Sequence, residues 1–172
     1  GNALEQRGIR VEYTRIGDVY NSPYEKAEIG NRSAADLFLS IHRNAMPVPG
    51  TGSGTMSLIF GRGGDAETFA RNINKELAKT GWKDLGISER PNLVVLRDTA
   101  LPAVLVEVGF LDNENDNDFF DANMRQTADA IADGIVRTFA EQEKQTSDVE
   151  EPGFYMVQTG IYRVRTNAEQ EV

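Results

Sequence analysis

Two nearly continuous apolar runs constrain the fold of this chain more than any other feature of its sequence. They are DLFLSIH at residues 36–42 and PAVLVEVGF at residues 102–110. Runs of this kind are typical of strands buried on both faces, as in the sheets of α/β proteins. Strand-like segments at 9–15 and 55–60 alternate with amphipathic helical segments along the chain. We therefore expect an α/β fold with a mostly parallel sheet flanked by helices.

Helical patterns fill much of the remaining sequence. Their expected ranges are 3–8, 22–34, 65–81 and 118–142, and a further apolar strand is expected at 92–97. Ser22 and Pro23 form a typical helix start, with a capping hydroxyl followed by proline at the first helical position. Phe69, Ile73 and Leu77 share one face of the third helix. The core-facing positions expected in the last helix are Met124, Ala128, Ile131, Ile135 and Phe139.

The length and composition indicate a single domain with a short appendage. We assign residues 1–140 to the domain, 141–152 to a charged linker, and 153–172 to a strand-like segment too short to form its own core. The net charge of −9 argues against a nucleic-acid partner, whose phosphates such a surface would repel. No apolar stretch approaches the ~20 residues of a membrane span. The absence of cysteine excludes disulfides and thiolate metal sites.

The single histidine and one glutamate are the candidates for chemistry. His42 lies at the carboxyl end of the run at 36–42, and Glu107 lies late in the run at 102–110. Ligands of open α/β sheets bind beyond the carboxyl ends of the strands, so the two side chains suggest one site. A glutamate in so apolar a run calls for a partner or a task. The alternative is structural: His42 is a hydrogen-bonded core residue, and Glu107 pairs with an arginine such as Arg97.

The residues alone give little support for metal binding. A catalytic zinc usually takes three protein ligands, and this chain has one histidine and no second ligand at a recognisable spacing. The acidic run DNENDND at 112–118 lacks the glycine and the glutamate of a calcium loop, so we interpret it as a solvated loop and helix start. The glycine-rich GTGSGT at 50–55 precedes a strand, which is the wrong context for a phosphate loop.

Three segments share their motifs with one family. GIRVEYTRIGD ends a strand in Thr-Arg and continues to Asp, GNRSAADLFLSIHRNA contains Ser-Ile-His-x-Asn-Ala, and VLRDTALPAVLVEVGFLDN contains Glu-x-Gly-Phe-Leu-x-Asn. In this order and spacing, over 9–18, 31–44 and 91–113, they resemble the zinc-dependent N-acetylmuramoyl-L-alanine amidases, which cut peptidoglycan. The resemblance extends over residues 1–140.

The resemblance implies roles for three residues. His42 matches the later of the family's two zinc-binding histidines, and Glu107 matches the catalytic glutamate that works with the zinc-bound water. Asn44 would help to shape the substrate site. The family's other two zinc ligands lie on a first strand ending in Asp-Pro-Gly-His-Gly-Gly and on the helix after it. Both ligands lie upstream of residue 1, and GNALEQRG at 1–8 looks like the tail of that helix. We therefore expect an N-terminally incomplete domain that lacks the family's first strand.

The C-terminal segment FYMVQTGIYRVRTNAEQ, within 153–172, resembles the start of a SPOR domain, a peptidoglycan-binding module. Together the two resemblances imply zinc as cofactor, peptidoglycan as substrate, and a location in the cell wall, in the periplasm or outside the cell. The bond cleaved would join N-acetylmuramic acid to the L-alanine of the stem peptide. With two ligands missing, we expect this chain alone to be inactive unless a second chain completes the sheet. The alternatives are a non-enzymatic peptidoglycan-binding remnant and a truncated gene product.

Overall fold

The computed structural model describes residues 1–146 and 156–159. Residues 147–152 of the linker expected at 141–152 lie outside these ranges, whereas residues 141–146 belong to the helix Glu114–Thr146. The SPOR-like segment at 153–172 also lies outside them, apart from residues 156–159.

The described strands form one sheet in the order β1-β6-β2-β5-β3-β4. Their bounds are Arg10–Tyr13 (β1), Leu37–Asn44 (β2), Thr55–Ile59 (β3), Asp84–Glu89 (β4), Ala103–Phe110 (β5) and Met156–Thr159 (β6). Neighbouring strands are parallel except for β3 and β5, which are antiparallel. The expected α/β fold with a mostly parallel sheet is therefore confirmed.

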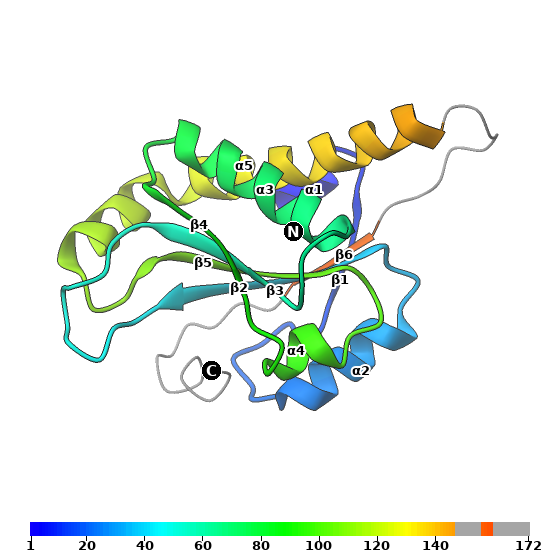
Figure 1. The fold of residues 1–172 in the computed structure, drawn as a ribbon, viewed down its shortest axis with the longest axis horizontal. Helices are drawn as coiled ribbons and strands as arrows, with labels where there is room; N and C mark the ends of the chain where they lie inside the picture. Colours follow the sequence, from blue (N-terminus) through cyan, green and yellow to red (C-terminus); the bar gives the residue numbers. More distant parts are fainter. Residues whose placement is uncertain (147–155, 160–172) are drawn as a thin grey trace.

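Helices cover both faces of the sheet (Figure 1). One face carries α1 (Asn2–Glu5), α3 (Asp65–Lys79) and α5 (Glu114–Thr146), and the other carries α2 (Pro23–Arg32) and α4 (Val94–Arg97). The start of α2 is the one expected: the Ser22 hydroxyl accepts the Glu25 backbone N–H at 3.2 Å, and the Glu25 carboxylate accepts the Ser22 N–H at 2.7 Å. Within the described residues, no helix combines the length and the apolar character that crossing a membrane requires.

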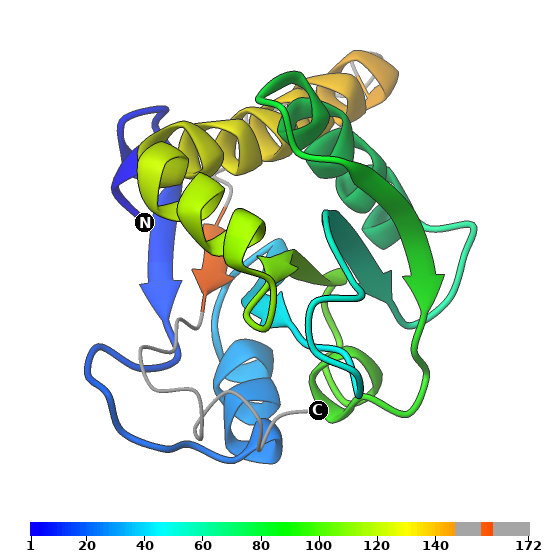
Figure 2. The same cartoon turned by 90° about the vertical axis from the view of Figure 1, so that its left-hand side faces the viewer.

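Strand β6 lies between β1 and β2 (Figure 2). Four of its residues are in parallel register with β1, and two are in register with Leu37 and Phe38 of β2. The strand in this interior position therefore comes from the segment at 153–172. Among the described residues, its pairing with β2 covers Leu37 and Phe38.

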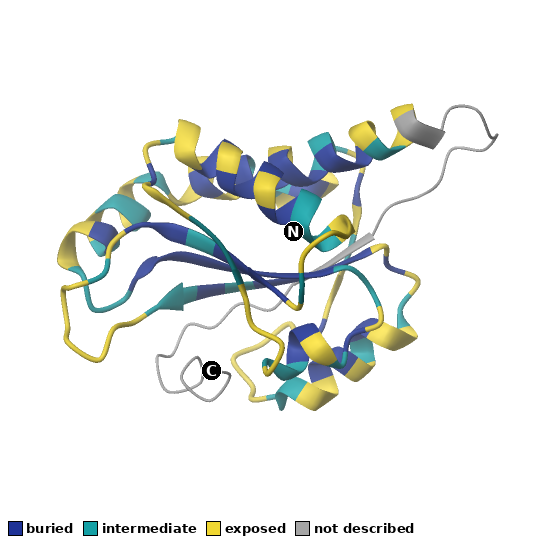
Figure 3. Ribbon diagram, viewed as in Figure 1, coloured by how far each residue is buried: buried dark blue, intermediate teal, exposed yellow. Residues whose placement is uncertain are grey.

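The core consists of two apolar clusters, one on each face of the sheet. The larger cluster joins Leu39 of β2 and Val106 of β5 to α3 and α5, and it includes Phe69, Ile73 and Leu77 as expected. The smaller cluster joins the opposite face of the sheet to α4, through Phe38, Leu58, Val95, Leu96, Ala103 and Leu105. Every residue of β5 is buried, and β2 is buried over most of its length (Figure 3). The two apolar runs are thus strands covered on both faces.

Two expectations about secondary structure are wrong. The segment expected as a strand at 92–97 contains helix α4, whose Val95 and Leu96 are buried against the sheet. A short apolar run fits a buried helix as well as a buried strand, so its pattern could not decide. Strand β4, Asp84–Glu89, was not expected at all. It is a half-exposed edge strand, and such strands lack a continuous apolar signal.

The long helix also differs from its expected form. α5 begins at Glu114, before residue 118, and its backbone kinks at Asn123. Of the five positions expected to face the core, Ile131, Ile135 and Phe139 are buried, whereas Met124 and Ala128 are exposed. One helical period does not continue through a kink, so positions close to it no longer follow the stripe set by the rest of the helix.

Candidate active site

His42 and Glu107 are neighbours on the adjoining parallel strands β2 and β5. Their Cα atoms are register partners in the ladder. Both side chains line a cavity of about 240 Å³ that also reaches Leu58 and Leu105 of the smaller apolar cluster. The rest of its lining is Asn44, Met56, Arg90 and Leu93. The structure thus brings together the two ionisable residues whose positions in the sequence suggested one site.

His42 is neutral at physiological pH. Its side chain is buried, and this burial, together with the positive charges of Lys26 and Arg15, lowers its pKa to about 4. The Ser40 hydroxyl lies 2.8 Å from Nε2, so it helps to orient the ring. A neutral imidazole is the form that binds a metal ion. The structural alternative explains the bond to Ser40, but it gives no reason for the cavity in front of the ring.

Glu107 is buried without a charged partner among the described residues. Burial raises its pKa to about 7, and its Oε2 atom makes no hydrogen bond within the described part of the chain. The proposed pairing with Arg97 is wrong, because Arg97 donates to the Asp98 carboxylate through Nε at 2.7 Å and through an Nη at 3.0 Å. A carboxyl with a pKa near neutral can both accept and donate a proton.

Two buried cations act on His42 and were missed by the sequence analysis. Lys26 lies on α2, and Arg15 follows β1; both side chains are almost fully buried. Each donates to backbone carbonyls of the loop at 16–21, Lys26 at 2.8 Å and Arg15 at 3.1 Å. Burial and the charge of Arg15 lower the pKa of Lys26 to about 8. The two residues come from different elements, so no basic cluster in the sequence marks them.

Asn44 lies at the end of β2, after a register shift, and lines the same cavity. Its side-chain oxygen accepts the N–H of Ala45 at 2.8 Å, and its backbone carbonyl accepts the N–H of Leu111 at 2.7 Å. The backbone at Asn44 is therefore hydrogen-bonded to the residue that follows β5. The substrate role that the resemblance implies for this residue stays a prediction.

The acidic run at 112–118 holds the loop that follows Asn44. Asp116 is buried, and its carboxylate accepts hydrogen bonds from the Ser53 hydroxyl at 2.7 Å, the Gly54 N–H at 3.0 Å and the Phe110 N–H at 2.9 Å. The helix start expected here is correct, because α5 begins at Glu114. The expectation of a solvated loop is wrong for Asp116, because a charge accepting three hydrogen bonds can be buried.

The described residues do not form a complete zinc centre. A catalytic zinc takes three protein ligands and leaves one position for water. Within the described ranges, no group of three or more histidine, aspartate or glutamate side chains is placed to hold a metal ion. His42 can supply one ligand, but the side chains around it do not complete the set.

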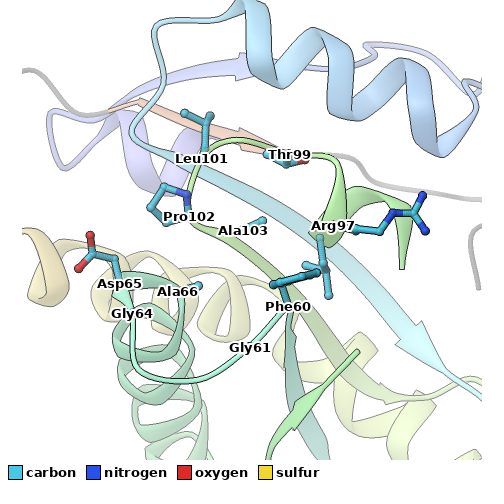
Figure 4. Close-up of a pocket in the computed structure, with 11 residues that line it drawn as sticks. Phe60, Gly61, Gly64, Asp65, Ala66, Arg97, Thr99, Leu101, Pro102 and Ala103 are labelled. Carbon is cyan, nitrogen blue, oxygen red and sulfur yellow. The ribbon is translucent and has the colours of Figure 1, made fainter. Parts of the chain in front are cut away.

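A larger cavity, of about 410 Å³, lies beside the first residue of β5 (Figure 4). Phe60, the start of α3 and the connection from α4 to β5 line it. Its two charged side chains, Asp65 and Arg97, lie on opposite sides of it in Figure 4, and Arg97 is paired with Asp98. This cavity has no histidine and no buried carboxylate in its lining. The smaller cavity is therefore the candidate active site.

Comparison with known proteins identifies the family. The family model described as N-acetylmuramoyl-L-alanine amidase (Amidase_3) matches residues 1–137. The N-acetylmuramoyl-L-alanine amidase CwlM of Bacillus licheniformis is 31% identical over 169 residues. The sporulation-specific N-acetylmuramoyl-L-alanine amidase of Bacillus subtilis is 32% identical over 174 residues. Each match covers 96% of this chain and 62% of the relative, so the chain spans less than two thirds of these relatives.

Solved structures are similar to this fold. The catalytic domain of CwlV, an N-acetylmuramoyl-L-alanine amidase from Bacillus (Paenibacillus) polymyxa, is 31% identical with a TM-score of 0.71, over 81% of this chain and 78% of that one. The amidase Ami1 from Mycobacterium smegmatis is 26% identical with a TM-score of 0.74, over 82% and 72%. The sheet, the pairing of His42 with Glu107 and the match over residues 1–137 have one explanation: this chain belongs to the family of N-acetylmuramoyl-L-alanine amidases.

Proposed function

We propose that this chain carries the hydrolytic site of a peptidoglycan amidase, which cleaves the amide bond between N-acetylmuramic acid and the L-alanine of a stem peptide. The main support is the pairing of His42 and Glu107 in one cavity of a chain that belongs to this family. The names of the relatives specify the N-acetylmuramoyl-L-alanine bond. A location in the cell wall, in the periplasm or outside the cell follows from this substrate.

Glu107 is the proposed general base and acid. In its ionised form it takes a proton from the attacking water, whose oxygen bonds to the carbonyl carbon of the lactyl group. The carbon–nitrogen bond then breaks, and the protonated carboxyl gives its proton to the alanine nitrogen. The products are a muramic acid carboxylate and a peptide with a free amino terminus. A pKa of about 7 suits both proton transfers at neutral pH.

Zinc is the proposed cofactor, because it polarises carbonyl groups and lowers the pKa of bound water. His42 would supply one ligand, in the neutral form that its environment maintains. The other ligands would come from outside the described residues or from a second chain, which is the reason to expect little activity from this chain alone. Asn44 would contact the substrate at the rim of the cavity.

The test combines zinc analysis with an assay on a soluble muropeptide. Zinc is measured by elemental analysis after dialysis, with His42→Ala as the control, and hydrolysis is followed as new alanine amino termini. Zinc-dependent hydrolysis that Glu107→Gln lowers by about 10²-fold or more supports the amidase. A chain that neither binds nor hydrolyses the muropeptide contradicts the proposal.

A second candidate is a peptidoglycan-binding protein without enzymatic activity. The incomplete set of zinc ligands among the described residues favours it. Because little hydrolysis is expected from this chain alone, binding of the muropeptide without hydrolysis would support this candidate over the amidase only if hydrolysis stays absent when a second chain supplies the missing zinc ligands. A peptidoglycan-binding role for the SPOR-like segment at 153–172 belongs to either candidate and stays a prediction.

A further inference from the structure

We propose that Arg90 binds a carboxylate of the stem peptide, so that the site selects acidic peptides. The inference rests on the proposed function, because it names the part of the substrate that this residue would recognise. Arg90 is the cation in the lining of the cavity that holds His42 and Glu107. A peptide whose scissile bond lies at Glu107 would therefore pass within reach of a guanidinium group.

The backbone and one nitrogen of Arg90 are fixed by its neighbours. Its N–H donates to the carbonyl of Ile59 at 2.8 Å, and its carbonyl accepts the N–H of Leu93 at 3.1 Å. One terminal nitrogen of the guanidinium donates to the Ser88 hydroxyl and, at 2.9 Å, to the carbonyl of Glu89. These bonds direct the side chain, so less of its rotamer freedom is lost when a ligand binds.

The other side of the guanidinium is available to a ligand. Among the described residues, Nε and the second terminal nitrogen of Arg90 make no hydrogen bond, and the side chain forms no ion pair. Nε and one terminal nitrogen are the pair of donors that an arginine offers to both oxygens of a carboxylate.

Several exposed arginines of this chain are paired with acidic side chains. Arg62 binds Glu67 at 2.8 Å, Arg97 binds Asp98 at 2.7 Å, and Arg32 binds Glu28 at 3.2 Å. Arg90, by contrast, lines the cavity that holds His42 and Glu107 and has no acidic partner among the described residues.

The cavity itself suits a short piece of peptide. Met56, Leu58, Leu93 and Leu105 supply an apolar wall. A volume of about 240 Å³ lies below the ~300–1,000 Å³ of most small-molecule sites, so it takes part of a polymer rather than a whole ligand. Stem peptides carry carboxylates on the acidic residue after L-alanine and at the carboxyl terminus, and either source offers the same chemistry.

The experiment measures binding of three N-acetylmuramoyl peptides to the full chain by calorimetry. The first peptide has both carboxylates free, the second has the internal one amidated, and the third has the terminal one amidated. We expect one of the two amides to bind about 10-fold more weakly than the free acid, which identifies the carboxylate that is recognised. In Arg90→Gln the free acid and this amide should bind with about equal affinity, a ratio of about 1. Arg71→Gln, an exposed position on α3 outside the cavity, should keep the difference.

The other possible outcomes of this experiment contradict the role of Arg90. Equal binding of all three peptides to the unchanged protein overturns the role of Arg90 and leaves the proposed function intact. A 10-fold preference that persists in Arg90→Gln also overturns it, since another residue then reads the carboxylate. Failure to bind any of the three peptides contradicts both the inference and the proposed function.

Discussion

Replacing Glu107 with glutamine is expected to stabilise the folded protein at neutral pH, although it removes the proposed catalytic group. Glutamine has the shape of glutamate but cannot ionise. The buried carboxyl has a pKa of about 7 in the folded protein, against an ordinary value of 4.5. Between these two pH values the folded state holds a proton that the unfolded state has lost. Rising pH therefore favours unfolding of the unchanged protein over this range.

The size of the effect follows from the two pKa values. One pKa unit is worth about 1.4 kcal/mol, so the change from 4.5 to about 7 corresponds to about 3 kcal/mol. The destabilisation of the folded state by the buried Glu107 carboxyl is fully present above pH 7 and disappears below pH 4.5. His42 acts in the opposite sense, because its pKa is lowered from 6.5 to about 4. That contribution is the same in both proteins, so it cancels when their stabilities are compared.

The measurement is urea unfolding of both proteins from pH 4.5 to 8, followed by the fluorescence of Trp82. This is the only tryptophan of the chain and is buried, so its emission reports on the core. The stability of Glu107→Gln relative to the unchanged protein should rise with pH by about 3 kcal/mol. Glu25→Gln is the control of opposite sign, because hydrogen bonds from Ser22 lower the pKa of Glu25. A difference for Glu107→Gln that stays flat with pH would refute the assignment of a buried, protonated carboxyl.

Three further substitutions test structural contacts outside the candidate active site. Asp116→Asn removes the charge that accepts three hydrogen bonds, so we expect a loss of about 2–4 kcal/mol in urea unfolding and faster hydrogen exchange at the Gly54 amide. Exchange rates equal to those of the unchanged protein would show that Asp116 does not hold this loop. Gly109→Ala places a Cβ atom 2.9 Å from the Trp82 ring at a backbone φ of +73°, so a loss of about 2–3 kcal/mol and a changed Trp82 emission are expected. An unchanged emission would contradict this close approach. Ser22→Ala removes the cap of α2 and should lower the free energy of unfolding by about 1 kcal/mol, whereas a neutral result would mean that the cap is not formed in solution.

The buried parts of the fold were predictable because their patterns are local. The nearly continuous apolar runs of β2 and β5 predict strands buried on both faces, and the stripe on α3 repeats at the helical period. These residues are buried as expected. The prediction of a strand at 92–97 was wrong because four consecutive apolar residues fit a short buried helix as well as a strand. Strand β4 was not predicted because it is an edge strand that pairs with β3 through its backbone. Such pairing leaves no apolar pattern in the sequence.

Some residues of the candidate site were also predictable from local patterns, and others were not. His42 and Glu107 were found because each interrupts an apolar run at the end of a strand. Lys26 and Arg15 were not found, since their effect on His42 depends on burial and on the folding of two separate elements. Arg90 lies outside any regular pattern, and only the cavity shows that it faces the same space as Glu107. Positions near a site can thus be predicted from a strand, but the charges around it need the tertiary structure.

The electrostatics of His42 also bear on how a zinc site could be completed. Lys26 and Arg15 contribute to lowering the pKa of His42, so they oppose positive charge at the ring. The same potential would act on a zinc ion with twice the charge of a proton. A group that completes the site would therefore have to bring negative charge to offset the two cations.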